Sequence, residues 1–95
     1  MNEEKRQYLC RSMASALPVL RKAIGATQQE LADILGVTRN TIIHMERSKT
    51  MGWPSYLSFL MIFSRNENTV SLIRVFDLYP AEVDDYLAGR VRAQA

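Results

Sequence analysis

Apolar residues are spaced at helical intervals along almost the whole chain. Near its start, five of them recur at steps of three and four: Leu9, Met13, Ala16, Leu20 and Ile24. This spacing predicts one apolar helical face, but Pro18 falls inside it, and a proline in a helix interior removes a backbone hydrogen bond. We therefore expect two helices, one over residues 3–14 and a second that is capped by Ser15 and ends at Gly25.

Two short helices follow, and each of them begins at a threonine. Thr27 and Glu30 are spaced as a capping box, in which each side chain bonds the backbone N–H of the other residue. Gly36 stands where a left-handed residue ends a helix, and Thr38 caps a helix that runs to about residue 47. The apolar face of the first of these helices comprises Leu31, Ala32, Ile34 and Leu35.

The second half of the chain predicts three further helices. Pro54 opens a helix that ends near Phe63 and is apolar on nearly every side, so we expect it at the centre of the fold. Another helix ends before Tyr79, and the last begins at Pro80. The apolar stripe of the last helix consists of Val83, Tyr86, Leu87 and Val91. The chain is therefore predicted to be all-α, a compact bundle of about six short helices.

Length and composition place the chain among ordinary globular domains. Its 95 residues, 47% hydrophobic and 23% charged, suit a single domain over residues 1–95. The net charge of +2 is unevenly spread, because residues 1–50 carry eight Lys and Arg against five acids, whereas residues 51–95 carry four against five. Any attraction to a polyanion is therefore expected in the first half of the chain.

The same inventory argues against several classes of function. One cysteine and one histidine allow neither an intramolecular disulfide nor a metal cluster, and a reducing cytoplasm suits them best. The longest apolar stretch, residues 56–63, is too short to span a bilayer, and the acidic, polar start is unlike a secretory signal. No nucleophile with its base and no glycine-rich phosphate loop can be assembled. We expect a cytoplasmic protein that is not an enzyme, needs no cofactor or metal and binds no membrane.

Residues 28–47 carry the pattern typical of a DNA-binding helix-turn-helix. Two short helices are separated only by a turn that Gly36 allows, and Ala32 is small where the helices must cross closely. The apolar positions that lock the two helices at a steep angle are Leu31, Leu35, Val37, Ile42 and Met45. In such a motif the second helix lies in the major groove of DNA.

At these residues the sequence resembles the Cro/C1-type (Xre-like) helix-turn-helix family of phage repressors and small bacterial regulators. The motifs that carry the resemblance are Thr27-Gln28-Gln29-Glu30-Leu31-Ala32, Gly36-Val37-Thr38 and Ile42-Ile43-His44-Met45-Glu46. The resemblance extends over residues 17–63 and implies a lambda-repressor-like core in which residues 38–47 form the DNA-recognition helix. Two departures stand out: Ser48 occupies a position where the family often has glycine, and Trp53 precedes Pro54.

The resemblance also implies roles for three polar residues around the motif. Gln28, at the start of a helix, looks like the family's phosphate-binding glutamine. Arg21 and Glu46 look like its structural ion pair, so we expect them to position the recognition helix without contacting bases.

Helical geometry predicts which side chains of the recognition helix face outward. With Ile42 and Met45 turned inward, steps of 100° expose one face and leave Arg39 at its leading edge. The candidates for base contact are Arg39, Asn40, Ile43 and His44. Arginine donates twice to guanine, asparagine pairs with adenine and isoleucine suits a thymine methyl, whereas the alternative for His44 is an ordinary solvated side chain. The candidates for phosphate contact, besides Gln28, are Thr38, Thr41, Arg47 and Lys49.

These observations predict a sequence-specific regulator of transcription, a repressor, that binds double-stranded DNA. A single small module makes few phosphate contacts, so a homodimer on two half-sites is expected. Residues 64–95 are the candidate dimerisation element, through the last helix and exposed parts of Phe59 and Phe63, with packing inside the monomer as the alternative. A second hypothesis is a protein-interaction module, antitoxin-like or adaptor, that binds a protein partner through its C-terminal helices.

Single residues with chemistry of their own are expected to be structural. Cys10 is predicted to be a buried apolar residue or an idle thiol, and Trp53 is predicted to belong to the core or an interface.

Overall fold

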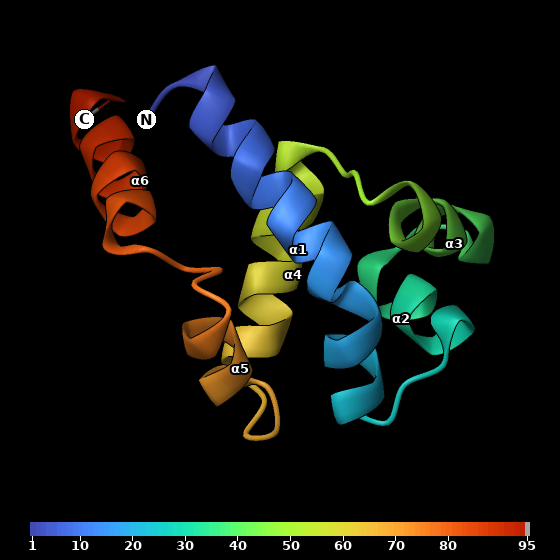
Figure 1. The fold of residues 1–95 in the computed structure, drawn as a ribbon. Helices are drawn as coiled ribbons and strands as arrows, with labels where there is room; N and C mark the ends of the chain where they lie inside the picture. Colours follow the sequence, from blue (N-terminus) through green and yellow to red (C-terminus); the bar gives the residue numbers. More distant parts are fainter. Residues whose placement is uncertain (95) are drawn as a thin grey trace.

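The computed structural model describes residues 1–94, with side chains up to residue 89, and all of its regular structure is helical (Figure 1). The helices of this part of the chain are α1 (Glu3–Ala23), α2 (Gln28–Leu35), α3 (Arg39–Ser48), α4 (Trp53–Ser64), α5 (Val70–Val75) and α6 (Ala81–Gln94). The prediction of an all-α bundle of about six helices is therefore confirmed. None of these helices is long and apolar enough to cross a lipid bilayer.

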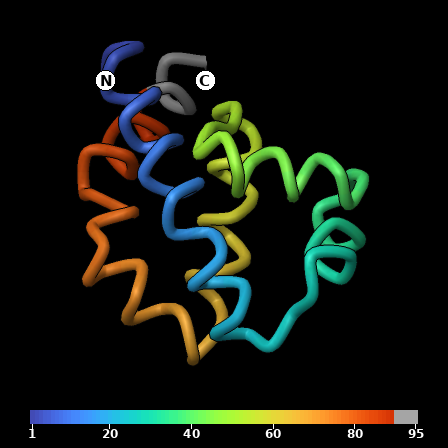
Figure 2. Tube along the Cα trace, turned by 45° about the vertical axis from the view of Figure 1, so that its right-hand side comes forward, coloured from blue at the N-terminus to red at the C-terminus, as the bar shows by residue number. Residues whose placement is uncertain are grey.

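Helices α1 and α4 pack side by side along the middle of the molecule. Figures 1 and 2 show α2 and α3 together on one side of this pair, and α5 and α6 on the other. The start of α1 and helix α6 lie at the same end of the bundle, where Lys5 forms an ion pair of 3.1 Å with Glu82 and Arg6 donates to the Tyr86 hydroxyl over 3.3 Å. The central pair thus carries the helix-turn-helix segment on one side and the C-terminal helices on the other.

The prediction of two helices before residue 25 is wrong, because α1 continues through Pro18. Ser15 is an exposed residue within this helix and caps nothing. The side chains that α1 buries are Leu9, Cys10, Met13, Ala14, Leu17 and Leu20, whereas Ala16 and Ile24 are only half-buried. A proline in a helix interior costs about 3 kcal/mol, but each fully buried leucine contributes about 1.5–3 kcal/mol, so the long buried face outweighs the lost hydrogen bond.

Helix α4 supplies the centre of the core, as its apolar sequence predicts. Tyr56, Phe59, Leu60 and Phe63 are buried, and the rings of Phe59 and Phe63 are stacked with centroids 5.8 Å apart. The prediction that Phe59 and Phe63 present exposed parts to a partner is therefore wrong, because both rings are fully enclosed within the monomer.

The apolar stripe predicted for the last helix, α6, packs largely inside the monomer. Val83 is fully buried, and Leu87 packs half-buried against the same core. The side chain of Val91 lies outside the described residues. Packing within the monomer, the alternative weighed above, is therefore what the structure shows for Val83 and Leu87.

Cys10 is buried with 5% of its surface exposed, as expected for an apolar structural residue. Burial raises the pKa of its thiol, so the thiol stays protonated at neutral pH. Trp53 is half-buried and stacks on Tyr56, with ring centroids 4.7 Å apart.

Two buried hydroxyls tie the connections after α4 to the core. The Tyr56 hydroxyl donates to the backbone oxygen of Leu78 over 2.5 Å, and Thr69 Oγ1 donates to the backbone oxygen of Phe63 over 2.7 Å. Buried carbonyls need such partners, because an unsatisfied one costs about 1–3 kcal/mol. These two bonds hold the segment between α4 and α6 in place.

The Tyr56→Phe substitution tests this arrangement. We expect the free energy of unfolding at neutral pH to fall by about 1–3 kcal/mol, because the Leu78 carbonyl loses its donor. Burial raises the pKa of Tyr56 above its ordinary value of 10.0, so the folded protein holds this proton more tightly than the unfolded chain. Wild type therefore loses this contribution as the pH rises above 10.0, and the variant does not.

Urea titrations at neutral and alkaline pH measure both effects, and the stability gap between the two proteins should narrow in alkali. Tyr8→Phe is the matched control, because the Tyr8 side chain is 54% exposed. Equal stability of Tyr56→Phe and wild type at neutral pH contradicts the role assigned to this bond.

Candidate nucleic-acid interface

The turn between α2 and α3 is closed by backbone hydrogen bonds. Gly36 adopts a left-handed conformation with φ of 78°, and its N–H donates to the Ala32 oxygen over 2.8 Å. The N–H of Val37 donates to the same oxygen over 3.0 Å. Residues with a side chain rarely adopt this backbone conformation, so glycine is the residue that permits the turn.

Threonines cap both helices of the motif. Thr27 Oγ1 accepts from the Glu30 N–H over 3.0 Å, and Glu30 Oε1 accepts from the Thr27 N–H over 3.0 Å, which confirms the predicted capping box. The backbone N–H of Thr27 holds the pKa of the Glu30 carboxyl below its ordinary value of 4.5. Thr38 Oγ1 accepts from the Thr41 N–H over 3.3 Å, so α3 also begins where the sequence predicts.

An apolar seam fixes α2 against α3. Its fully buried members are Leu31, Ala32 and Ile42, Met45 is 7% exposed, and Leu35 and Val37 are half-buried. Ile34, which the sequence placed on this apolar face, is 59% exposed, so that part of the prediction is wrong. A helix of 8 residues turns only one face to the core, and Leu31 and Leu35, one turn apart, occupy it.

One ion pair joins α1 to α3 behind the motif. Arg21 Nε of α1 donates to Glu46 Oε2 of α3 over 2.8 Å, and Arg21 Nη2 donates to Glu46 Oε1 over 3.3 Å. The side chains are only 13% and 9% exposed, so water screens this pair weakly. This is the ion pair that the family resemblance implies, and Arg21 Nη1 adds a bond of 3.1 Å to the Ala26 oxygen.

Gln28 completes this network. Its Nε2 donates to Glu46 Oε1 over 3.1 Å, so the side chain implied to bind phosphate also anchors the start of α2 to α3. Sequence reasoning missed this contact, although a glutamine at the start of one helix and a carboxylate on its partner could have suggested it. The amide nitrogen of Gln28 carries two N–H groups, so one remains for a ligand.

The outward face of α3 is polar and accessible. Arg39, Asn40, His44 and Arg47 are exposed, whereas Ile43 and Thr41 are half-buried. These orientations follow from the inward placement of Ile42 and Met45. The structure thus brings the four base-contact candidates onto one helix, next to the hydroxyls of Thr38 and Thr41, which lie 2.9 Å apart.

The end of α3 accommodates the departure from the family pattern. Ser48 stays helical, and its hydroxyl donates to the His44 oxygen over 2.6 Å. The left-handed residue is Lys49, with φ of 56°, whose N–H donates to the Met45 oxygen over 3.0 Å. Glycine is therefore not required at position 48, because the left-handed position falls one residue later.

Comparison with known proteins supports the same segment. Residues 20–51, from the end of α1 to the loop after α3, match a protein-family model described as helix-turn-helix. This match, over about a third of the chain, confirms the resemblance to the Cro/C1 type. No curated protein and no solved structure matches the chain.

Substitution of Glu46 tests the network behind the motif. We expect Glu46→Ala to lower the free energy of unfolding by about 2–4 kcal/mol, because it leaves the enclosed Arg21 guanidinium without its partner. Glu67→Ala, at an exposed loop position, is the matched control and should change stability by less than about 0.5 kcal/mol. Chemical denaturation followed by circular dichroism measures both variants. A Glu46→Ala protein as stable as its control rules out the positioning role.

Proposed function

We propose, from the Cro/C1-type helix-turn-helix that residues 20–51 carry, that this protein is a sequence-specific DNA-binding regulator of transcription, and specifically a repressor. The observation that carries the proposal is the outward face of α3, where donors suited to base edges lie on a helix that Glu46 and the apolar seam hold firmly. Repression follows most simply, because a bundle bound at a promoter excludes other proteins from the duplex it covers.

Helix α3 fits the major groove in size and chemistry. Its 10 residues span about 15 Å, against a groove about 12 Å wide, so the first turns reach base edges while the last turn stays near the phosphates. In this position Arg39 donates its two N–H groups to a guanine and Asn40 pairs with an adenine. Ile43 contacts a thymine methyl, and His44 donates to a base or a phosphate.

Phosphate contacts fix the register of the helix on the duplex. Thr38 and Thr41 present hydroxyls at the start of α3, where the helix dipole also favours an anion. Arg47 and Lys49 are exposed at its other end, and Gln28 offers its remaining N–H at the start of α2. These five side chains flank the base-contacting face on both sides.

Binding measurements with two variants test the proposal. A duplex enriched by the wild-type protein from a random-sequence library is compared with a scrambled duplex by fluorescence anisotropy at several salt concentrations. Arg39→Ala and Asn40→Ala should each weaken binding to the selected duplex by about 5- to 150-fold, with little change on the scrambled one. Arg74→Ala, which removes an exposed cation from α5 on the far side of the molecule, should bind as wild type does.

Three outcomes contradict the proposal. They are failure to enrich any duplex, equal weak binding of both duplexes by wild type, and loss of binding in Arg74→Ala as large as in Arg39→Ala. The first two would redirect the search to a protein partner.

The proposal includes a homodimer that binds two half-sites. Two copies of α3 must lie about one helical turn of DNA apart, so the interface has to leave both recognition helices free. A pocket between α4 and α6 meets this condition, because its lining residues include none from α3, and α6 lies on the opposite side of the central helix pair from α3 (Figure 1). Its apolar lining includes Leu57, Leu60, Met61, Tyr79 and Leu87, of which Met61 is 62% and Tyr79 39% exposed.

Sedimentation equilibrium tests the dimer. We expect wild type to associate and Met61→Arg to sediment as a monomer, because the cation added beside Arg65 has no carboxylate among the residues that line this pocket. Ile34→Arg is the matched control, since Ile34 is a similarly exposed apolar residue, at 59%, on the α2 side. A monomeric wild type at concentrations that saturate DNA, or dissociation by both variants alike, rejects this interface.

A further inference from the structure

A furrow at the end of α3 connects this helix with the first half of α1. Seven residues line it: Tyr8, Arg11, Ser12, Ser15, Ser48, Lys49 and Thr50. The four residues from α1 are spaced at steps of one, three and four, so they form one stripe along the exposed side of that helix. The other three residues belong to the end of α3 and the loop that follows it.

The chemistry of this furrow is uniform. Two of its lining residues are cations, and the other five carry hydroxyl groups, so no carboxylate lies among them. Arg11 and Lys49 are both exposed, and within residues 1–89 neither is paired with a carboxylate. Glu3, an acidic residue nearby on α1, is engaged by Arg6 over 2.6 Å and by Gln7 over 3.2 Å. Two unpaired cations surrounded by hydroxyls are suited to a phosphate group.

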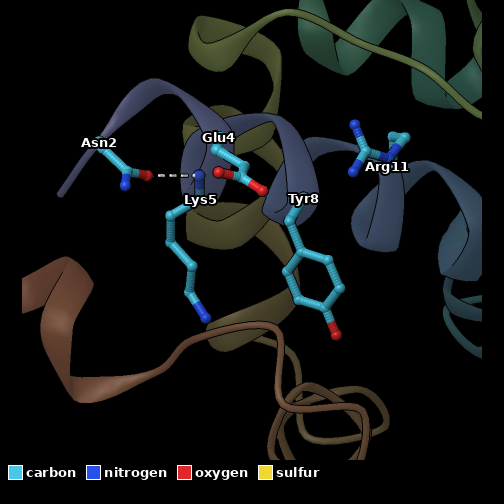
Figure 3. A pocket seen from close by; sticks show the side chains of 5 residues that line it. All are labelled: Asn2, Glu4, Lys5, Tyr8 and Arg11. Carbon is cyan, nitrogen blue, oxygen red and sulfur yellow. Dashed lines mark hydrogen bonds between the residues drawn. The ribbon is translucent and has the colours of Figure 1, made fainter.

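The furrow has a defined end along α1. Figure 3 shows Tyr8 and Arg11 in the neighbouring pocket, which Asn2, Glu4 and Lys5 complete. Lys5 Nζ lies 5.2 Å from the centroid of the Tyr8 ring, and Glu4 brings a negative charge. The cationic, hydroxyl-lined surface therefore stops near Tyr8, one to two turns after the start of α1.

We propose that this furrow binds a phosphodiester of the DNA backbone, with Arg11 and Lys49 as its charged contacts, so that the DNA footprint extends beyond the helix-turn-helix onto α1. The inference rests on the proposed function and deepens it. The furrow starts at the last residues of α3, which lie near the phosphates when the first turns of that helix occupy the groove. Residues 8–15 lie outside the segment that matches the family model, so the family match assigns nothing to them.

The lining hydroxyls differ in what they can offer a ligand. The hydroxyls of Ser12 and Ser48 donate to the backbone oxygens of Tyr8, over 2.9 Å, and of His44, over 2.6 Å, and that of Thr50 lies 3.1 Å from Ser48 Oγ. The Ser15 and Tyr8 hydroxyls make no hydrogen bond within residues 1–89, so they can donate to a phosphate oxygen beside the two cations. A base edge instead requires a specific pattern of donors and acceptors. The furrow should therefore add affinity without adding sequence preference.

Salt-dependent binding of Arg11→Ala tests the inference. The selected and the scrambled duplex used above are both titrated, and the slope of log K against log salt is compared with wild type. We expect the slope to fall by about 1 and the affinity for both duplexes to fall by the same factor, which is the signature of a lost phosphate contact. Arg11→Lys should retain the wild-type slope. Ser15→Glu should bind both duplexes more weakly than wild type does, because it places a negative charge in the furrow.

A second measurement locates the phosphate. Duplexes in which single phosphates are replaced by uncharged methylphosphonates are bound by wild type and by Arg11→Ala. Replacement of one particular phosphate should weaken DNA binding by wild type and leave binding by Arg11→Ala unchanged, because the variant has already lost the contact with that phosphate. Arg74→Ala again serves as control, and unfolding curves check that Arg11→Ala folds as wild type does, as an exposed and unpaired side chain predicts.

The outcomes separate the two proposals. If wild type prefers its selected duplex and Arg11→Ala keeps the full salt slope, the furrow is not a phosphate site, although the regulator proposal stands. If Arg11→Ala weakens binding to the selected duplex and leaves binding to the scrambled duplex unchanged, the furrow contacts bases and the inference is wrong. If wild type shows no preference for any duplex, the regulator proposal fails, and the phosphate site inferred from it fails as well.

Discussion

The Glu46 carboxylate is the polar contact on which the helix-turn-helix depends. It accepts from Arg21 of α1 and from Gln28 of α2, so three helices meet at one side chain that is 9% exposed. Partial burial strengthens these charge-assisted bonds and makes the loss of any partner costly. The apolar seam between α2 and α3 sets their crossing, but the network fixes where the pair sits on α1. The direction in which α3 points therefore follows from this contact.

The rest of the fold serves as a support for that arrangement. Helix α4 fills the space behind α1 with aromatic side chains, and the Tyr56 and Thr69 hydroxyls attach the following connections to it. The C-terminal helix closes over the start of α1 through Lys5 and Arg6. Helix α1 packs against α4 on one side and against α3 on the other, so it attaches the motif to the core. The surface proposed to bind DNA is accordingly built mainly on helices, with Lys49 and Thr50 directly after the end of α3.

The sequence predicts the local structure of the motif well and its wider setting less well. The capping box of Thr27 and Glu30, the turn at Gly36 and the cap at Thr38 depend on neighbours along the chain, so they are visible in the sequence. The helix that continues through Pro18 could not be predicted from local sequence, because burial of α1 against α4, a tertiary effect, outweighs the local cost of the proline. The enclosure of Phe59 and Phe63 and the exposure of Ile34 likewise depend on which helix packs against which face. The furrow joins residues about 35 positions apart in the chain, so the sequence did not predict it.

The state of Cys10 has a practical consequence for studies of this protein in solution. Its thiol is enclosed, and burial keeps it protonated, whereas alkylating reagents and disulfide exchange require an accessible thiolate. The native chain should therefore remain unmodified under mild labelling conditions. A second cysteine introduced on an exposed surface would be the one reactive thiol, so a fluorophore or spin label can be attached at a chosen position without first removing the natural cysteine.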